Sequence, residues 1–209
     1  MAPKGNPYTV GMPLPPELVR ELSRDEVNAL EIRRYEGEVR LVETPQELER
    51  AAGEWREERV MGFDTETRPA FRPGESYLPA LAQLATARRV YLLPLQRLDC
   101  SGVLRGLLGA EHTIKVGVGM PDDFRALRKS FEFAEKAIVD LGAVARGHKL
   151  KQSGVRYLAA LLLGIRIPKG TKTSNWAAPK LSQQQIAYAA TDAWICRELY
   201  LKFEALELL

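Results

Sequence analysis

The chain has 209 residues, 45% of them hydrophobic, and a formal net charge of +3. That length is enough for one α/β domain with a full core and is short for two. No apolar run approaches the ~20 residues that a membrane span needs, and the first residues lack the layout of a secretory signal. We therefore expect a soluble, intracellular protein with no membrane contact.

The positive charge is concentrated in one part of the sequence. Between Asp140 and Asp192 there is no Asp or Glu, whereas Lys and Arg together occur eight times. A cationic segment of this kind is expected where a polyanion lies beside carboxylates, although an accident of composition is the alternative. Two cysteines, Cys100 and Cys196, stand far apart and outside any Cys/His cluster, so they predict neither a zinc site nor a disulfide framework.

The N-terminal part, residues 1–30, is predicted to be a partly helical extension that packs on a domain formed by residues 31–209. A capping-box pattern, Ser23-Arg24-Asp25-Glu26, marks a helix start within the extension. Two short strand-like runs, 32–35 and 39–42, then predict a hairpin, because turn residues separate them.

The next elements have clear local signals. Thr44-Pro45-Gln46-Glu47 predicts the capped start of a helix. The short apolar run 59–66 predicts a central strand, because buried strands read as unbroken apolar runs. The runs 81–86 and 89–95 are joined by Ala87-Arg88, and this tight connection predicts two antiparallel neighbours.

The remaining elements alternate between helix and strand. They are a helix over 101–108, a strand over 113–118, a helix over 121–129, a brief strand over 137–139, and helices over 155–163 and 182–208. Asp140 is placed to cap the helix that follows the brief strand. Together the elements predict an α/β fold in which a mixed sheet, with three antiparallel strands followed by parallel ones, carries helices on both faces.

Asp64 and Glu66 end the predicted central strand. Residues two apart on a strand point to the same face, so both carboxylates aim at one spot. Two anions this close repel unless cations lie between them, and divalent metals bind carboxylate oxygens. An Asp-x-Glu pair on its own is a weak signal, because most such pairs are solvated surface residues.

A second acidic pair, Asp122 and Asp123, opens the helix that follows Val116-Gly117-Val118-Gly119. The glycines lack the third position of a dinucleotide fingerprint, so we expect them to let the backbone pass close to a ligand instead. The pattern does not decide which aspartate is a ligand, because one of them can instead favour the helix N-terminus by its charge.

Tyr188 and Asp192 lie four residues apart in the last predicted helix, and this spacing stacks them on one face. As a core residue the tyrosine would be ordinary. Next to a metal-binding carboxylate, its hydroxyl could orient or deprotonate a water molecule for in-line attack on a phosphodiester.

Three segments, VMGFDTET, KVGVGMPDDFRAL and LSQQQIAYAATDA, resemble the three exonuclease motifs of the DEDD superfamily of 3′-to-5′ exonucleases, in its tyrosine-bearing branch. The resemblance covers about residues 40–205. Lys172-Thr173-Ser174-Asn175-Trp176 adds an element common in the branch that contains ribonuclease D and the Werner-syndrome exonuclease domain. Matched motif by motif, the resemblance assigns catalytic roles to Asp64, Glu66, Asp123 rather than Asp122, Tyr188 and Asp192.

The resemblance implies a ribonuclease H-like sheet and two magnesium or manganese ions bound by the four acidic residues Asp64, Glu66, Asp123 and Asp192. One metal would activate the attacking water and the other would stabilise the leaving 3′ oxygen. Glu66 would also hold the terminal 3′ hydroxyl. The expected partner is therefore a single-stranded or frayed nucleic-acid 3′ end, because the scissile phosphate must enter a cleft.

Candidates for substrate contact are chosen by position relative to the motifs and by residue type. They are Thr67, Phe71, Leu81, Gln83, Lys172, Ser174, Asn175 and Trp176. Aromatic side chains can stack on bases, and lysine can neutralise phosphate. For Trp176 a packing role in the core is an equal alternative.

Three functions are consistent with these motifs. We expect an exonuclease that releases nucleoside 5′-monophosphates from DNA, because the motif neighbourhoods are closer to the Werner-type arrangement. A ribonuclease D-like enzyme that trims RNA 3′ ends has the same motifs and is the alternative. A binding module without activity would have lost at least one ligand, and none is missing. The sequence does not predict the oligomeric state.

Overall fold

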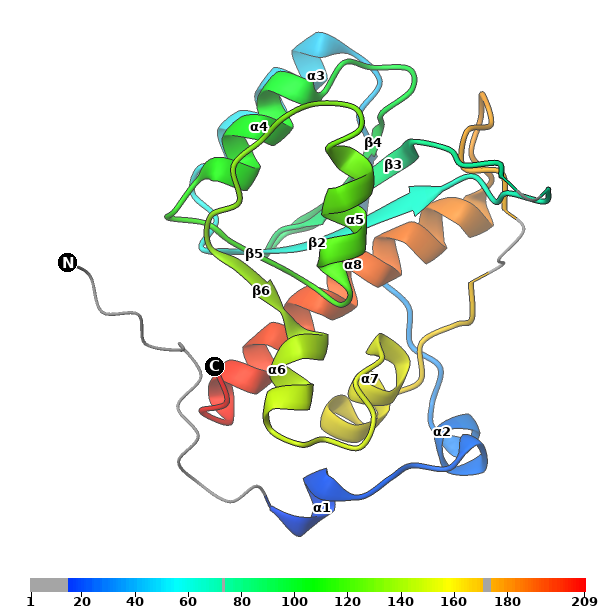
Figure 1. Cartoon of the computed structure of the whole chain (residues 1–209), viewed down its shortest axis with the longest axis vertical. Helices are drawn as coiled ribbons and strands as arrows, with labels where there is room; N and C mark the ends of the chain where they lie inside the picture. The colour runs from blue at the N-terminus through cyan, green and yellow to red at the C-terminus, as the bar shows by residue number, and fades with distance from the viewer. Residues whose placement is uncertain (1–14, 73, 171–173) are drawn as a thin grey trace.

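The computed structural model describes residues 15–72, 74–170 and 174–209, which form an α/β fold (Figure 1). Its helices are α1 (Pro16–Val19), α2 (Arg24–Ala29), α3 (Pro45–Trp55), α4 (Ser101–Gly109), α5 (Met120–Leu127), α6 (Leu141–Gly147), α7 (Val155–Leu163) and α8 (Gln183–Ala205). Its strands are β1 (Glu38–Leu41), β2 (Val60–Thr67), β3 (Pro79–Ala85), β4 (Arg89–Pro94), β5 (Ile114–Gly117) and β6 (Ile138–Asp140).

The strands form one six-stranded sheet in the order β1-β4-β3-β2-β5-β6. Strands β2, β3 and β4 are antiparallel neighbours, whereas β1, β5 and β6 each pair in parallel with a neighbour. The predicted mixed sheet is confirmed, and β2 lies near its centre. The tight connection between β3 and β4 joins antiparallel neighbours, as the sequence predicts.

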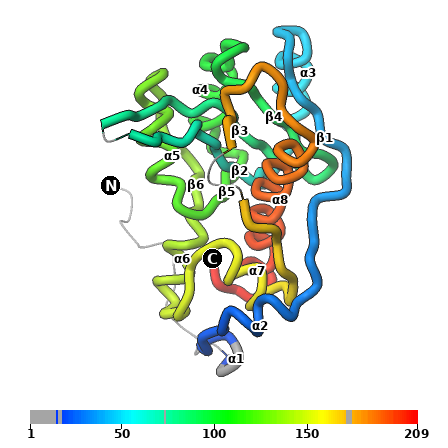
Figure 2. The backbone as a smooth tube through the Cα atoms, turned by 90° about the vertical axis from the view of Figure 1, so that its right-hand side faces the viewer, coloured from blue at the N-terminus to red at the C-terminus, as the bar shows by residue number. Residues whose placement is uncertain are grey.

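The predicted hairpin at residues 32–42 is wrong. Only its second half, β1, is a strand, and it pairs in parallel with β4. Residues 31–35, here called the strap, run past the sheet toward β1 and are seen in blue in Figure 2. The Arg33 backbone N–H donates to the Arg166 carbonyl at 2.9 Å, and the Tyr35 N–H donates to the Thr191 hydroxyl at 3.1 Å.

Helices cover both faces of the sheet. In Figure 2, strands β2 and β5 lie between α5 on the left and α8 on the right. Trp55 of α3, Leu104 of α4 and Phe124 of α5 belong to one core cluster with Phe63 of β2. The opposite face packs against α8, which contacts β2, β3, β4 and β5, with α6 and α7 beside it.

The backbone of α8 rests directly on β2. A Cβ atom added at Gly62 would overlap the Ala193 carbonyl oxygen and would lie 2.9 Å from the Ala193 carbonyl carbon. Ala189 and Ala190 of α8 are also fully buried against this face. Small residues on both elements therefore allow the short distance between the α8 backbone and β2.

Residues 15–30 of the N-terminal part pack on α7 and on the residues just before it. The Leu22 N–H donates to Gln152 Oε1 at 2.9 Å, and Gln152 Nε2 donates back to the Leu22 carbonyl at 3.0 Å. Val27 of α2 packs with Ala160 of α7. Within the residues that the structure describes, no helix combines the length and the apolar character needed to cross a bilayer.

Asp140 caps α6, as predicted. Its Oδ1 accepts a hydrogen bond from the Ala143 N–H at 2.9 Å, and its Oδ2 accepts one from the Gly119 N–H at 2.9 Å. Gly119 has a φ of 83°, a left-handed conformation that glycine adopts without strain, and it precedes α5 directly. Asp140 therefore fixes the turn that orients α5.

Candidate active site

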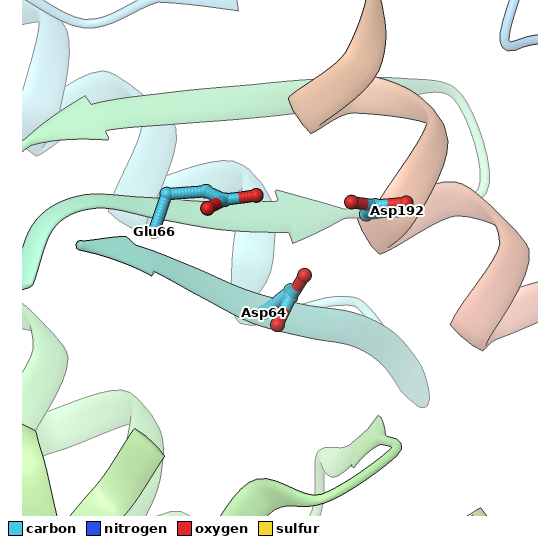
Figure 3. A group of neighbouring side chains, drawn as sticks. All are labelled: Asp64, Glu66 and Asp192. Atoms are coloured by element: carbon cyan, nitrogen blue, oxygen red, sulfur yellow. The ribbon is translucent and has the colours of Figure 1, made fainter. Parts of the chain in front are cut away.

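Three carboxyl groups from two elements meet on the α8 side of the sheet (Figure 3). Asp64 and Glu66 lie on β2, and Asp192 lies on α8. Each offers one oxygen, and these oxygens all lie within 4.8 Å of one another. Figure 3 shows the carboxyl groups of Glu66 and Asp192 pointing toward each other. The period of two along a strand explains why Asp64 and Glu66 share a face.

The structure distinguishes the two aspartates at the start of α5. The Asp123 carboxylate accepts a hydrogen bond from the Thr65 hydroxyl of β2, and its charge contributes to the raised pKa of Asp64. The Asp122 carboxylate instead forms an exposed ion pair with Arg125 at 2.8 Å. Asp123 is therefore the aspartate that lies beside the carboxyl cluster.

Burial raises the pKa of every carboxyl group in this cluster. The pKa of Glu66 rises to about 8, and the charges of Asp192 and Asp123 add to the effect of burial. The pKa of Asp192 rises to about 7 by burial, although the hydrogen bond from Tyr188 opposes this. Asp123 reaches about 6, and the pKa of Asp64 lies well above its usual range. A divalent cation would relieve this repulsion, so the cluster has the character of a metal site.

Tyr188 lies one turn before Asp192 on α8. Burial and then the charge of Asp192 raise the pKa of its phenol far above the usual value, so the hydroxyl keeps its proton at neutral pH. A Cβ atom added at Gly170 would overlap the Tyr188 hydroxyl, which means that the backbone passes directly against the phenol. The tyrosine hydroxyl is thus a confined hydrogen-bond donor next to a carboxylate.

A pocket of about 170 Å³ encloses this group, with Asp64, Glu66, Tyr188 and Asp192 in its wall. We call it the carboxylate pocket. Two of these four residues come from β2 and two from α8, whereas Asp123 of α5 is not in the wall. The three carboxyl groups give the pocket the chemistry of a hard-cation site.

A protein-family model described as 3′-5′ exonuclease matches residues 39–206. The chain belongs to this family. The match covers all six strands, apart from the first residue of β1, and helices α3 to α8. It therefore includes all the elements that carry the carboxyl cluster.

Similarity to individual proteins agrees with the assignment to the 3′-5′ exonuclease family. The mouse bifunctional 3′-5′ exonuclease/ATP-dependent helicase WRN is 32% identical over 150 residues, covering 68% of this chain and 11% of that protein. Ribonuclease D of Haemophilus influenzae is 30% identical over 145 residues, covering 68% of this chain and 35% of that protein. The chain thus spans about a tenth to a third of the length of these two relatives.

The fold also matches a solved exonuclease domain. The EXO domain of Aedes aegypti Nibbler superimposes with a TM-score of 0.75 at 22% sequence identity, covering 83% of this chain and 91% of that one. At this identity the likeness is one of fold. It agrees with the predicted sheet architecture.

Burial argues against two of the substrate contacts that the sequence analysis predicts, Leu81 and Gln83. Leu81 and Gln83 are both 0% exposed, and they pair across the sheet with Glu66 and Asp64. They lie beneath α8 and offer no surface to a nucleic acid. Within the described residues, neither amide atom of Gln83 has a hydrogen-bond partner. Trp176 is 6% exposed and packs near Tyr188, with ring centroids 6.0 Å apart, so most of its ring is buried. Contact of its small exposed surface with a substrate stays a prediction.

The other predicted substrate contacts keep accessible surface. Phe71 is 70% exposed, and Asn175 is exposed as well. Thr67, at the end of β2, and Ser174 are partly buried. Lys172 lies outside the described residues. Contact of these side chains with a substrate remains a prediction.

Two further residues of the carboxylate pocket with polar or reactive side chains, Cys196 and Arg156, are given no role at the site by the sequence analysis. Cys196 lies one turn beyond Asp192 on α8, and Arg156 lies on α7. The four-residue spacing from Asp192 to Cys196 was an available signal, because it continues the Tyr188–Asp192 face. Burial raises the pKa of the Cys196 thiol, which is therefore neutral. For Arg156 the sequence offers only its membership of the cationic segment.

The metal-free protein is expected to lose stability as the pH rises from about 4 to about 8, a window set by the ordinary carboxyl pKa and the pKa of Glu66. Within it the unfolded chain releases protons that the folded carboxyl cluster still binds, so the free energy of unfolding falls with pH. Thermal unfolding in excess chelator at pH 5 and pH 8 measures this. Added magnesium should raise the melting temperature more at pH 8, and no magnesium effect at pH 8 would contradict a cation site.

Proposed function

We propose that the chain is a metal-dependent 3′-to-5′ exonuclease that releases nucleoside 5′-monophosphates from single-stranded or frayed 3′ ends, with DNA as its main substrate. The observation that carries this proposal is the meeting of three carboxyl oxygens within 4.8 Å on the sheet of a 3′-5′ exonuclease family member. The similarity to mouse WRN, a 3′-5′ exonuclease by name, supports the choice of activity.

The donor set fits hard divalent cations, because carboxylate oxygens are the ligands that magnesium and manganese prefer. We assign Asp64, Glu66, Asp123 and Asp192 to hold two such ions. When bound, the ions supply a water nucleophile that is reactive at neutral pH and stabilise negative charge on the leaving oxygen. Their positive charge also removes the repulsion that raises the carboxyl pKa values.

The remaining chemistry falls to the protein's own side chains. The Tyr188 hydroxyl keeps its proton at neutral pH, so we assign it to orient the attacking water by a hydrogen bond rather than to deprotonate it. Glu66 is assigned to accept a hydrogen bond from the terminal 3′ hydroxyl. This contact would favour chain ends over internal phosphodiesters, because only an end offers that hydroxyl.

A second candidate function is the trimming of RNA 3′ ends. Ribonuclease D of Haemophilus influenzae matches the same share of this chain, 68%, as mouse WRN does, and at nearly the same identity. The carboxyl cluster serves either sugar, since the reacting phosphodiester is the same. The choice between them depends on contacts to the 2′ position.

Two separate single strands of the same sequence, one of DNA and one of RNA, each labelled at the 5′ end, test both candidates. With magnesium or manganese, the labelled strand should shorten one nucleotide at a time and release mononucleotides, and excess chelator should stop the reaction. A circular single strand has no 3′ end and should stay intact. Undiminished cleavage in chelator would refute the metal requirement, and faster loss of RNA would select the second candidate.

A further inference from the structure

A larger pocket, of about 420 Å³, lies next to the carboxylate pocket, and we call it the upstream pocket. Arg34, Lys169 and Trp176 are in its wall. The two pockets share Pro168 and Tyr188 in their walls, so they are adjacent at these residues. None of the described residues that line the upstream pocket is acidic, whereas the carboxylate pocket has three carboxyl groups.

The strap fixes Arg34 at the upstream pocket. The backbone is hydrogen-bonded on both sides of this residue, through the Arg33 N–H to the Arg166 carbonyl and through the Tyr35 N–H to the Thr191 hydroxyl. Thr191 directly precedes Asp192 on α8. Arg34 is therefore held in register with the helix that carries the carboxyl cluster, although it lies more than 150 positions earlier in the chain.

Arg34 and Lys169 are available to bind an anion. Both are exposed, and neither forms an ion pair within the part of the chain that the structure describes. The adjacent Arg33, by contrast, pairs with Glu31 at 3.4 Å. Two cations without an ion-pair partner among the described residues, in the wall of a pocket next to the acidic one, attract phosphate and direct a polyanion toward the carboxyl groups.

The sizes of the two pockets are also different. The carboxylate pocket, at about 170 Å³, is below the usual range of about 300–1,000 Å³ for ligand pockets, whereas the upstream pocket, at about 420 Å³, lies within it. The rings of Tyr188 and Trp176 give the upstream pocket an apolar wall, and Gln183 and Gln184 give it amide groups that can hydrogen-bond to a base. Positive charge can bind the phosphate of a nucleotide, and ring surface and amide groups can contact its base.

We infer that the upstream pocket binds the nucleotide that remains on the strand after cleavage, with its phosphate paired to Arg34 and Lys169. The inference rests on the proposed exonuclease function and names the part of the substrate that this pocket takes. The strand would then cross the Tyr188 phenol on its way to the carboxyl cluster. Arg34 and Lys169 are thus binding residues for the polymer and have no part in bond cleavage.

Two kinds of substrate test this inference. The first is a labelled oligonucleotide, and the second is thymidine or uridine 5′-(p-nitrophenyl phosphate), in which nitrophenol takes the place of the upstream nucleotide. Arg34→Ala and Lys169→Ala should each lower kcat/KM on the oligonucleotide by about tenfold, because each loses one phosphate contact, and should flatten its salt dependence. Both variants should cleave the nitrophenyl ester at the wild-type rate. Matched controls are Arg33→Ala in the strap and Lys151→Ala in the cationic segment, which remove the same charge away from the pocket.

Direct binding keeps the test independent of cleavage. The dissociation constant of the oligonucleotide, measured by fluorescence anisotropy with calcium in place of magnesium, should rise about tenfold for the two pocket variants and stay unchanged for the two controls. Equal losses on oligonucleotide and ester, or pocket variants that bind like the controls, would overturn the inference. A wild-type protein that cleaves neither substrate would refute the proposed function, and the binding measurement would still decide the role of the pocket.

Discussion

Asp192→Asn is expected to lower the cleavage rate on the order of a thousandfold while raising the stability of the metal-free protein. The rate falls because an amide is a weak ligand, and the contribution of a bound metal to transition-state stabilisation amounts to several kcal/mol. The stability rises because the amide has no charge to repel Asp64 and Glu66, whose pKa values the Asp192 carboxylate raises. A variant that was merely misfolded would lose both activity and stability.

Three measurements check this expectation: single-turnover kinetics at saturating magnesium, manganese affinity by titration calorimetry, and melting temperature in chelator at pH 8. Tyr188→Phe is the matched control on the same helix face. It should bind manganese like the wild type and slow cleavage about a hundredfold, because it removes a hydroxyl and leaves the carboxylates in place. Wild-type manganese affinity and cleavage in Asp192→Asn would remove Asp192 from the metal site.

Gly62→Ala is expected to have the largest effect on folding, a loss of about 3 kcal/mol in the free energy of unfolding. The new methyl group would overlap the Ala193 carbonyl oxygen and approach the Arg197 backbone nitrogen to 3.1 Å. Both are backbone atoms, so no side-chain rotation relieves the overlap. Helix α8 has to move away from β2, and Asp192 moves with it.

Denaturant unfolding measures the loss, and Gly53→Ala is the control. Gly53 lies inside α3, and a Cβ atom there meets nothing within 4 Å. Alanine is a better helix former than glycine, so this control should gain up to about 1 kcal/mol. If Gly62→Ala were as stable as the wild type, α8 would not rest on β2 as the structure shows.

Elements with a local signal were predictable from the sequence. The capping boxes at Ser23, Thr44 and Ser182 are all present, because each depends on residues three positions apart. The hairpin at residues 32–42 failed for the opposite reason. The partners of the strap, Arg166 and Thr191, lie far along the chain, and no pattern within the strap points to them.

In the candidate site, too, the features that depend on local spacing were predictable from the sequence, and those that depend on tertiary packing were not. The shared face of Asp64 and Glu66 follows from the period of two in a strand, and the shared face of Tyr188 and Asp192 follows from the helical repeat. That these two faces meet depends on α8 crossing β2, which only the resemblance to exonuclease motifs implied. Burial of Gln83 also depends on α8, so its residue type and its position near a motif gave the wrong expectation.

The anchoring of the strap bears on how the protein is divided into fragments. The family match begins at residue 39, downstream of both hydrogen bonds that hold the strap. A fragment trimmed to the matched limits would retain every carboxyl group of the cluster but lose Arg34, and it would leave the Thr191 hydroxyl without the Tyr35 N–H. We therefore propose residue 31 as the latest starting point for expression and inhibitor screening, since a shorter version would lack the anchored strap and the substrate contact proposed for Arg34.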